Sequence, residues 1–273
     1  MRSIAKLMKD WQFTGPNGVT TAVELPHTWN ARDGQDGGND YWRGCCTYCT
    51  RFAAPVYDPA QQQVWLQFEG VNASAAVLLN GQQLCTHDGG YSTFRAEVTE
   101  LLQAENQLTV RVDNSVNDRV YPQKADFTFY GGIYRDVSLL VVNKNHIALG
   151  HFGDTGVKIT PALQENSSDI RVETLVEGSG TVTVELLDAE GRTVAKGEGE
   201  NAFLHLDAPH LWNGVKDPYL YTCVVRLLQD GQPVDEVTTR VGLRSFSVDA
   251  MCAAYPSSCS PSAPARRRAR RPA

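Results

Sequence analysis

The feature that most constrains the fold is the regular alternation of short apolar runs with turn signals. Short strands separated by turns about every 8–12 residues are typical of antiparallel β-sandwiches. Three of these runs have a dipeptide that favours a hairpin turn near their middle: VLLNGQQL at 77–84 with Asn80-Gly81, the run at 182–197 with Glu190-Gly191, and the run at 219–248 with Asp230-Gly231.

Other segments follow the period of a β-strand. The run LTVRV at 108–112 places Leu108, Val110 and Val112 on one face, as in a strand with one buried side. DVSLLVV at 136–142 is almost continuously apolar and indicates a strand buried on both faces. A helical period appears only in the short turn VTELL at 98–102, so the sequence predicts an all-β protein.

The chain is long enough for two domains. It has 273 residues, against a usual domain size of about 150. The rhythm of the strands changes near residues 143–150, which predicts one sandwich over 1–145 and a second over 146–250.

A segment of different composition follows at 251–273. It is rich in Pro, Ala, Ser and Arg, and we expect it to be disordered because it has too few apolar residues to form a core. It could serve as a basic arm for anionic partners. The interpretation that we favour is a non-native or frame-shifted terminus.

Charge and hydropathy exclude two classes of function. The formal net charge is −6, and the basic residues outside the last segment are scattered, so no basic surface for nucleic acid is expected. The start of the chain, MRSIAKLMKDWQF, lacks the apolar core of a secretion signal, and no segment approaches the ~20 apolar residues of a membrane span. We therefore expect a cytoplasmic protein that contacts neither nucleic acid nor membrane.

The cysteines do not form a convincing zinc motif. Cys46 and Cys49 have the C-x-x-C spacing, but the chain has no second pair to complete four ligands. Alternation along a strand places Cys45 and Cys49 on one face and Cys46 on the other, so small buried thiols are the better interpretation. An odd total of seven also argues for thiols rather than a disulfide framework: Cys45, Cys46, Cys49, Cys85, Cys223, Cys252 and Cys259.

The stretch QKADFTFYGGIYRDV at 123–137 is unusual for a surface loop. Gly131-Gly132 allows a sharp turn ahead of a buried strand. Arg135 and Asp136, at the start of that strand, are best explained as structural residues. Asp126 stands among aromatic residues, where a carboxylate is costly unless a donor or ligand satisfies it. This makes Asp126 a candidate acceptor for a hydroxyl group or a ligand for a cation.

A second unusual stretch is GQDGGNDYWRG at 34–44. It is either a plain solvent loop or a loop that presents Asn39 and Asp40 to a sugar beside an aromatic ring. Sugars suit the second arrangement because their hydroxyls need fixed polar partners and their C–H faces need apolar contact. The sequence has no G-x-S-x-G, Walker A or dinucleotide-binding motif to indicate another chemistry.

Several collinear segments resemble glycoside hydrolase family 2, which contains β-galactosidases, β-glucuronidases and β-mannosidases. The resemblance covers residues 1–249, and its β-galactosidase branch fits best. The segments are LPHTWN (25–30), GGNDYWRG (37–44), FEGVNASAAVLLNG (68–81), GGYSTFRAEVTELL (89–102), ENQLTVRVDNS (105–115), DFTFYGGIYRDVSL (126–139), PHLWNGVKDPYLYTCVVRL (209–227) and DEVTTRVGLRSFSVD (235–249).

The resemblance implies a jelly-roll, galactose-binding-like sandwich followed by an immunoglobulin-like sandwich. In the family the two catalytic glutamates of a retaining mechanism lie on a following TIM barrel. This sequence departs from the family pattern near residue 250. We therefore expect an N-terminal fragment that has no catalytic residue of its own and does not hydrolyse glycosides alone.

The resemblance also gives the candidate residues a role. It implies that Asp126 reaches the terminal sugar at the edge of the barrel pocket and helps to hold Na⁺, with Asn39 and Asp40 at the same edge. Na⁺ and Mg²⁺ would belong to a full-length parent. The expected partner is a β-galactoside-type carbohydrate, with self-association through surfaces that a barrel would cover. The alternative is a stand-alone carbohydrate-binding module.

Overall fold

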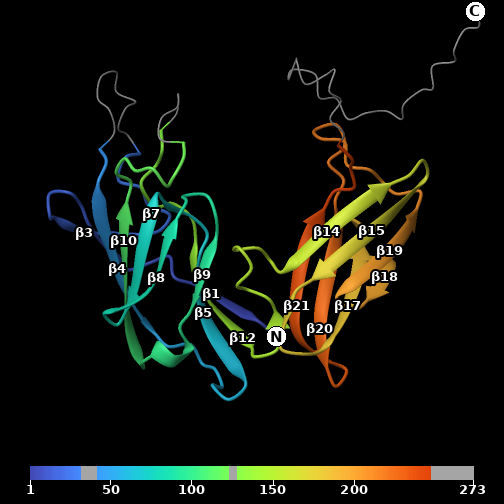
Figure 1. Cartoon of the computed structure of the whole chain (residues 1–273), viewed down its shortest axis with the longest axis horizontal. Helices are drawn as coiled ribbons and strands as arrows, with labels where there is room; N and C mark the ends of the chain where they lie inside the picture. Colours follow the sequence, from blue (N-terminus) through green and yellow to red (C-terminus); the bar gives the residue numbers. More distant parts are fainter. Residues whose placement is uncertain (32–41, 123–127, 247–273) are drawn as a thin grey trace, which may run out of the picture. The chain divides into compact units, whose positions relative to one another are not determined.

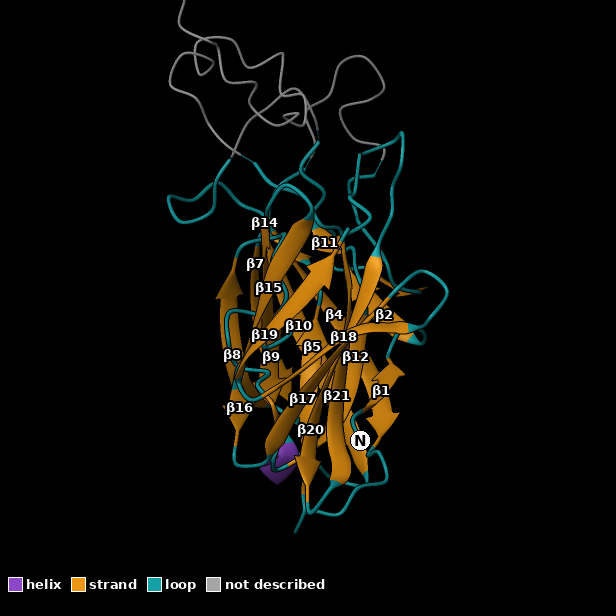
Figure 2. Ribbon diagram, turned by 90° about the vertical axis from the view of Figure 1, so that its right-hand side faces the viewer, coloured by secondary structure: helices purple, strands orange, loops and turns teal. Residues whose placement is uncertain are grey.

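The computed structural model describes residues 1–31, 42–122 and 128–246. These residues are almost entirely strands and loops, and their one helical element is the short 3-10 turn η1 (Thr99–Leu101) (Figure 2). The described residues contain no helix that is long and apolar enough to cross a membrane. The chain divides into two compact units, Met1–Lys144 with Leu149–Asp154, and Asn145–Ala148 with the residues from Thr155 onward.

The first unit is built from two main antiparallel sheets, coloured blue to green in Figure 1. The first sheet has the order β3 (Thr20–Val23), β2 (Trp11–Thr14), β4 (Cys45–Ala53), β10 (Glu105–Asp113), β7 (Ser74–Leu79) and β8 (Gln82–Asp88). The second has the order β1 (Ser3–Lys6), β12 (Val137–Asn143), β5 (Gln62–Phe68) and β9 (Phe94–Glu97), and a short pair joins β6 (Val71–Asn72) to β11 (Gly132–Ile133).

Alternate residues of these strands form one core. Leu108, Val110 and Val112 of β10 are fully buried, while the residues between them are more exposed. The inward residues of β5 and β12 belong to the same apolar cluster. In β10 a period of two therefore buries one face of the strand and leaves the other more exposed.

Strand β12 is buried on both faces because a second segment of the same unit covers its outer side. Leu140 and Val142 pack against Leu149 and Trp65, away from the main core. Arg95 holds this covering segment through hydrogen bonds of 2.8 Å from its guanidinium to the carbonyls of Leu149 and Asp154. The continuous apolar run of the sequence thus corresponds to a strand with two covered faces.

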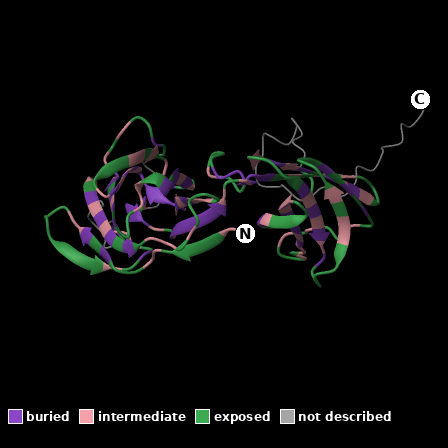
Figure 3. Cartoon of the chain, turned by 90° about the horizontal axis from the view of Figure 1, so that it is seen from below, coloured by how far each residue is buried: buried purple, intermediate pink, exposed green. Residues whose placement is uncertain are grey.

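The second unit is a smaller sandwich, coloured yellow to orange in Figure 1. Its first antiparallel sheet has the order β14 (Val157–Leu163), β15 (Ser167–Thr174) and β19 (Asn201–Asp207). Its second has the order β18 (Thr193–Glu198), β17 (Thr181–Leu187), β20 (Tyr221–Gln229) and β21 (Gln232–Val241). A short antiparallel pair joins β13 (His146–Ile147) to β16 (Val176–Glu177). Its core is a separate apolar cluster that includes Ile170, Leu186 and Leu227. Figure 3 shows the alternation of buried and exposed residues along its strands.

The predicted hairpins are present, with one difference in loop length. Asn80-Gly81 and Asp230-Gly231 form two-residue turns in which all four residues have positive φ, the geometry that such turns require. The hairpin at 182–197 instead has a five-residue loop between β17 and β18. The Oδ1 atom of Asp188 accepts hydrogen bonds from the backbone N–H groups of Glu190 and Arg192, which fixes this longer loop. Together with the families matched below, this all-β architecture confirms the predicted fold class.

Candidate functional site

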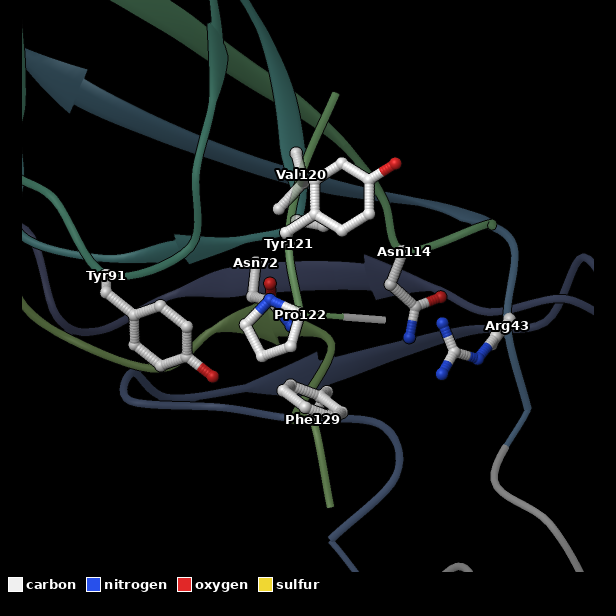
Figure 4. A pocket seen from close by; sticks show the side chains of 9 residues that line it. Arg43, Asn72, Tyr91, Asn114, Val120, Tyr121, Pro122 and Phe129 are labelled. Atoms are coloured by element: carbon white, nitrogen blue, oxygen red, sulfur yellow. The ribbon is translucent and has the colours of Figure 1, made fainter. Parts of the chain in front are cut away.

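The candidate site is a small cavity in the first unit, at the ends of several strands. It encloses about 20 Å³, which is space for roughly one water-sized group. Figure 4 shows Tyr91 on one side of the cavity, Arg43 and Asn114 on the other, and Pro122 and Phe129 between them. The lining residues are Arg43, Asn72, Ala73, Tyr91, Asn114, Val120, Tyr121, Pro122 and Phe129.

Buried asparagines position the wall formed by residues 129–131. Asn30 donates from Nδ2 to the carbonyl of Phe129 at 3.1 Å and accepts the N–H of Gly131 on Oδ1 at 2.8 Å. Asn72, at the end of β6, donates from Nδ2 to the carbonyl of Tyr130 at 2.9 Å. Side-chain amides thus satisfy backbone groups that lie outside any sheet, as buried polar groups require.

The Gly-Gly pair permits a close approach of chain segments. A Cβ at Gly132, where φ is +132°, would lie 2.5 Å from the carbonyl oxygen of His27 and 2.7 Å from Oη of Tyr48. A Cβ at Gly131 would collide with the indole of Trp29 and the amide of Asn114. Gly132 has the positive φ that glycine adopts readily, as the sequence indicated, and both glycines also lie against other segments of the chain, which the sequence did not indicate.

Below this turn, His27 and Tyr48 form a neutral hydrogen-bonded pair. Nδ1 of His27 is 2.7 Å from Oη of Tyr48. Burial lowers the pKa of His27, and burial also raises the pKa of Tyr48. These shifts favour the uncharged form of both groups, and the hydrogen bond between them supports the turn.

Asn114 joins the cavity to the strand that follows the 34–44 stretch. It comes directly after β10, its Oδ1 accepts the N–H of Gly44 at 2.8 Å, and its own N–H donates to the carbonyl of Gly44 at 3.2 Å. The residue is 4% exposed. Its Nδ2 atom is buried and has no hydrogen-bond partner in the described part of the chain.

Two exposed aromatic rings line the cavity. Tyr91 is 53% exposed and Tyr121 is 71% exposed. Trp42, which is less exposed, packs edge-on against Trp29 with ring centroids 6.1 Å apart. Aromatic faces beside a few fixed polar groups are the usual composition of a site that binds sugars.

The described lining offers no charged oxygen ligand for a metal ion. It contains no carboxylate, and hard cations such as Na⁺ or Mg²⁺ need oxygen ligands that carry charge or strong dipoles. No group of three His, Cys, Asp or Glu residues suitable for a metal occurs in residues 1–31, 42–122 and 128–246. The described residues therefore do not fit Na⁺ or Mg²⁺ by themselves.

The three site residues predicted from the sequence, Asp126, Asn39 and Asp40, lie outside the described residues. Each belongs to a stretch of sequence that leads into the cavity wall, since Arg43 follows Asp40 closely and Phe129 follows Asp126. The prediction missed the lining residues Asn114 and Tyr91. Their sequence signals were weak, because Asn114 follows an ordinary strand and Tyr91 follows a Gly-Gly turn.

Arg135 and Asp136 have the structural roles that the sequence indicated. The guanidinium of Arg135 donates to the carbonyls of Glu69 and Tyr91 at 3.3 and 3.1 Å. Asp136 forms an ion pair of 2.6 Å with Lys6. Neither residue lines the cavity.

The cysteine cluster lies on β4, as free thiols on alternating faces. Cys45 is exposed and Cys46 is buried. Cys49, on the same face as Cys45, receives a weak hydrogen bond from the hydroxyl of Thr109 at 3.8 Å. The predicted alternation is confirmed, but the expectation of buried thiols is wrong for Cys45, because the strand turns its face toward solvent.

Two models of protein families match this chain in succession. Residues 39–162 match the "Glycosyl hydrolase 2 galactose-binding domain-like" model, and residues 151–244 match the "Glycosyl hydrolases family 2" model. Together they cover the described parts of both sandwiches except the first strands.

Individual relatives agree with these models. A β-glucuronidase from Bacteroides fragilis is 33% identical over 89% of this chain and 38% of its own length, and the β-galactosidase BoGH2A from Bacteroides ovatus is 31% identical over 88% and 31%. The crystal structure of an FMN-binding β-glucuronidase from Facaelibacterium prausnitzii L2-6 superposes with a TM-score of 0.85, with 35% identity over 91% of this chain and 40% of that one. The chain thus spans less than half the length of the relatives that it matches.

Proposed function

Because this chain belongs to glycosyl hydrolase family 2, we propose that it forms the non-catalytic sandwich domains of a β-galactosidase-like retaining glycosidase and supplies residues at the edge of its sugar pocket. The observation that carries the proposal is the ordered match of both sandwiches to this family. The cavity with its aromatic rim is where the first sandwich would contact sugar.

The proposed substrate is a β-galactoside, because the stretch that contains Asp126 resembles the galactosidase branch. Similar proteins are named both β-glucuronidase and β-galactosidase, so a β-glucuronide is the competing substrate. In this proposal Asp126 accepts a hydrogen bond from a sugar hydroxyl and contributes to a Na⁺ site, and Asn39 and Asp40 contact the same sugar. The protein would act in the cytoplasm.

The chemistry itself would need residues beyond these domains. Retaining hydrolysis requires two carboxyl groups about 5 Å apart on either side of the scissile bond, and the described lining of the cavity contains none. The two domains would therefore bind and orient sugar, while a catalytic barrel would provide the acid/base and the nucleophile.

The test measures hydrolysis of nitrophenyl β-galactoside and nitrophenyl β-glucuronide by two proteins. One is the 273-residue chain, and the other is a longer protein in which the same chain is followed by a family-2 catalytic barrel. We expect turnover by the longer protein alone. Turnover by the shorter chain would overturn the proposal, because it would require a catalytic pair within these domains.

Substitution of Asp126 in the longer protein tests its role. We expect Asp126→Asn to lower kcat/KM by roughly tenfold or more, as expected for a lost hydrogen bond to a charged group. Asp136→Asn is the matched control, because that carboxylate pairs with Lys6 and does not line the cavity. Equal effects of the two substitutions would refute a sugar contact by Asp126.

The exposed rings of Tyr91 and Tyr121 favour a second candidate, a carbohydrate-binding module that acts unaided. Calorimetric titration of the 273-residue chain with galactose and lactose tests it. Heat of binding at millimolar sugar would support this candidate, and its absence would argue for a site that needs the barrel.

A further inference from the structure

Asn114 has a buried donor that the protein leaves unused. Its side chain is 4% exposed and lines the cavity, yet Nδ2 has no partner in the described part of the chain. A buried N–H without an acceptor costs about 1–3 kcal/mol relative to a satisfied one. Such a group in a native fold therefore calls for an explanation.

The orientation of the Asn114 amide is fixed by its other end. Oδ1 must accept the backbone N–H of Gly44, which can only donate. Exchange of the two amide atoms would place an NH₂ group against that N–H, so the donor has to be the end near the cavity. Figure 4 shows this end beside Arg43, with Pro122 between it and Tyr91 in this view.

A second unused donor lies close to the first. Nε1 of Trp29 is also buried without a partner among the described residues. A Cβ placed on Gly131 would be 2.6 Å from Cε2 of Trp29, the atom that carries Nε1, and 2.6 Å from Nδ2 of Asn114. Cε2 of Trp29 and Nδ2 of Asn114 are therefore no more than twice 2.6 Å apart. Two buried N–H groups without partners among the described residues, both near one glycine, make this corner deficient in acceptors.

The size of the cavity limits what can supply the acceptor. A volume of about 20 Å³ holds roughly one water-sized group, so one oxygen atom can enter but a sugar ring cannot. The ring would lie outside, against the aromatic rim, with one hydroxyl inserted.

We propose that Asn114 is a ligand-binding residue of this cavity, whose side-chain N–H donates a hydrogen bond to one inserted hydroxyl oxygen of a bound sugar. The proposal rests on the proposed function, which supplies the sugar. Asn114 thereby links the ligand to Gly44 and to the end of β10.

The direct test follows the Asn114 side-chain amide by NMR in the 273-residue chain labelled uniformly with ¹⁵N. Methyl β-galactoside and methyl β-glucuronide are titrated in turn. We expect the Asn114 NH₂ signals to shift with the same saturation curve as the backbone signals of Tyr91 and Tyr121. Binding that moves those signals and leaves the Asn114 amide unchanged would overturn the proposal.

The second test measures how a substitution of Asn114 changes the affinity for a set of monodeoxy sugars. Asn114→Asp keeps an oxygen for the N–H of Gly44 but replaces the donor with an acceptor. We expect it to weaken binding of the parent sugar roughly tenfold, the upper end for one hydrogen bond. The monodeoxy analogue that lacks the inserted hydroxyl should bind the native chain more weakly by a similar factor. It should bind the native chain and Asn114→Asp with the same affinity.

Asn106→Asp is the matched control, since Asn106 is 2% exposed and lies at the opposite end of the same strand. It introduces the same charge into a buried site and should leave sugar binding unchanged, while thermal melting reports the folding of both variants. Equal affinity of the native chain and Asn114→Asp would show that water alone satisfies the donor, and would overturn the proposal. Absence of every sugar-dependent shift at millimolar sugar would also overturn the proposal, whereas the proposed function is tested separately by hydrolysis in the longer protein.

Discussion

Gly131 illustrates how one missing Cβ determines the geometry of the cavity. Its backbone lies against the ring of Trp29 and the amide of Asn114, and both neighbours are held in place. The ring of Trp29 stacks on Phe13 with centroids 6.1 Å apart, and the amide is anchored on Gly44. Neither neighbour can retreat without breaking another contact.

Gly131→Ala is therefore expected to destabilise the first unit by about 1–3 kcal/mol, the usual cost of forcing extra volume into a packed site. The measurement is urea denaturation of the native chain and the variant. Gly15→Ala is the control, because its nearest neighbour would be 3.4 Å away, an ordinary contact. Equal effects at the two positions would show that space at Gly131 is not limiting.

His205 has a pKa that its neighbours raise. Its Nδ1 is 2.6 Å from Asp169 on β15, and its Nε2 is 3.3 Å from Asp207, which lies on β19 with the histidine. The hydrogen bond with Asp169 is the main cause of the raised pKa, followed by that with Asp207. Because the histidine is more than half exposed, solvent screens the pair.

We expect the stabilisation from His205 to be complete below its unfolded pKa, near 6.5, and to be lost as pH rises through the higher folded pKa. NMR titration of its ring protons in the native chain should give a value above 6.5. Asp169→Asn should lower that value. His87, whose pKa is lowered by burial, should titrate below 6.5 in both proteins and provides the internal reference.

At the scale of an element, strand β4 separates thiols of similar sequence context into different chemical environments. Cys45 and Cys46 are neighbours in the chain, but the strand turns the first toward solvent and the second into the core. Burial raises the pKa of Cys46 to about 11, and it raises that of Cys223 on β20 to about 11 as well.

Alkylation with iodoacetamide at pH 8 should therefore modify Cys45 in the folded chain and leave Cys46 and Cys223 unmodified. The thiolate is the reactive form, and a pKa of about 11 leaves about one thiolate per thousand molecules at this pH. Tandem mass spectrometry distinguishes the adjacent positions. In urea all three should react alike, whereas equal rates in the folded chain would contradict the assigned burial.

At the scale of the whole molecule, two apolar clusters lie in two compact units. Every residue of the cluster that contains Leu66 belongs to the first unit, and every residue of the cluster that contains Leu227 belongs to the second. Both leucines are fully buried.

We expect Leu66→Ala and Leu227→Ala each to cost about 2–5 kcal/mol, the usual penalty for emptying a buried leucine site. Scanning calorimetry should show two transitions, each substitution lowering the midpoint of one. A single transition that both substitutions shift equally would mean that the chain unfolds as one cooperative body.

The sequence by itself determined the fold class and most strand positions. Alternation in β10, continuous apolarity in β12 and the turn dipeptides are local signals, and local sterics and burial decide them. The resemblance to family 2 added the identity of both sandwiches. The domain limits at 145 and 250 remain predictions, and so do the roles of Asp126, Asn39 and Asp40.

Only the tertiary structure decided how the cavity is assembled. Arg43, Asn72, Tyr91, Asn114 and Phe129 come from separate parts of the chain, and no local pattern relates them. Asn114 in particular is an ordinary polar residue after a strand until the fold buries it and removes the partner of its Nδ2 atom. The strands follow from interactions between near neighbours in sequence, whereas an unsatisfied donor exists only once distant segments have excluded water from it.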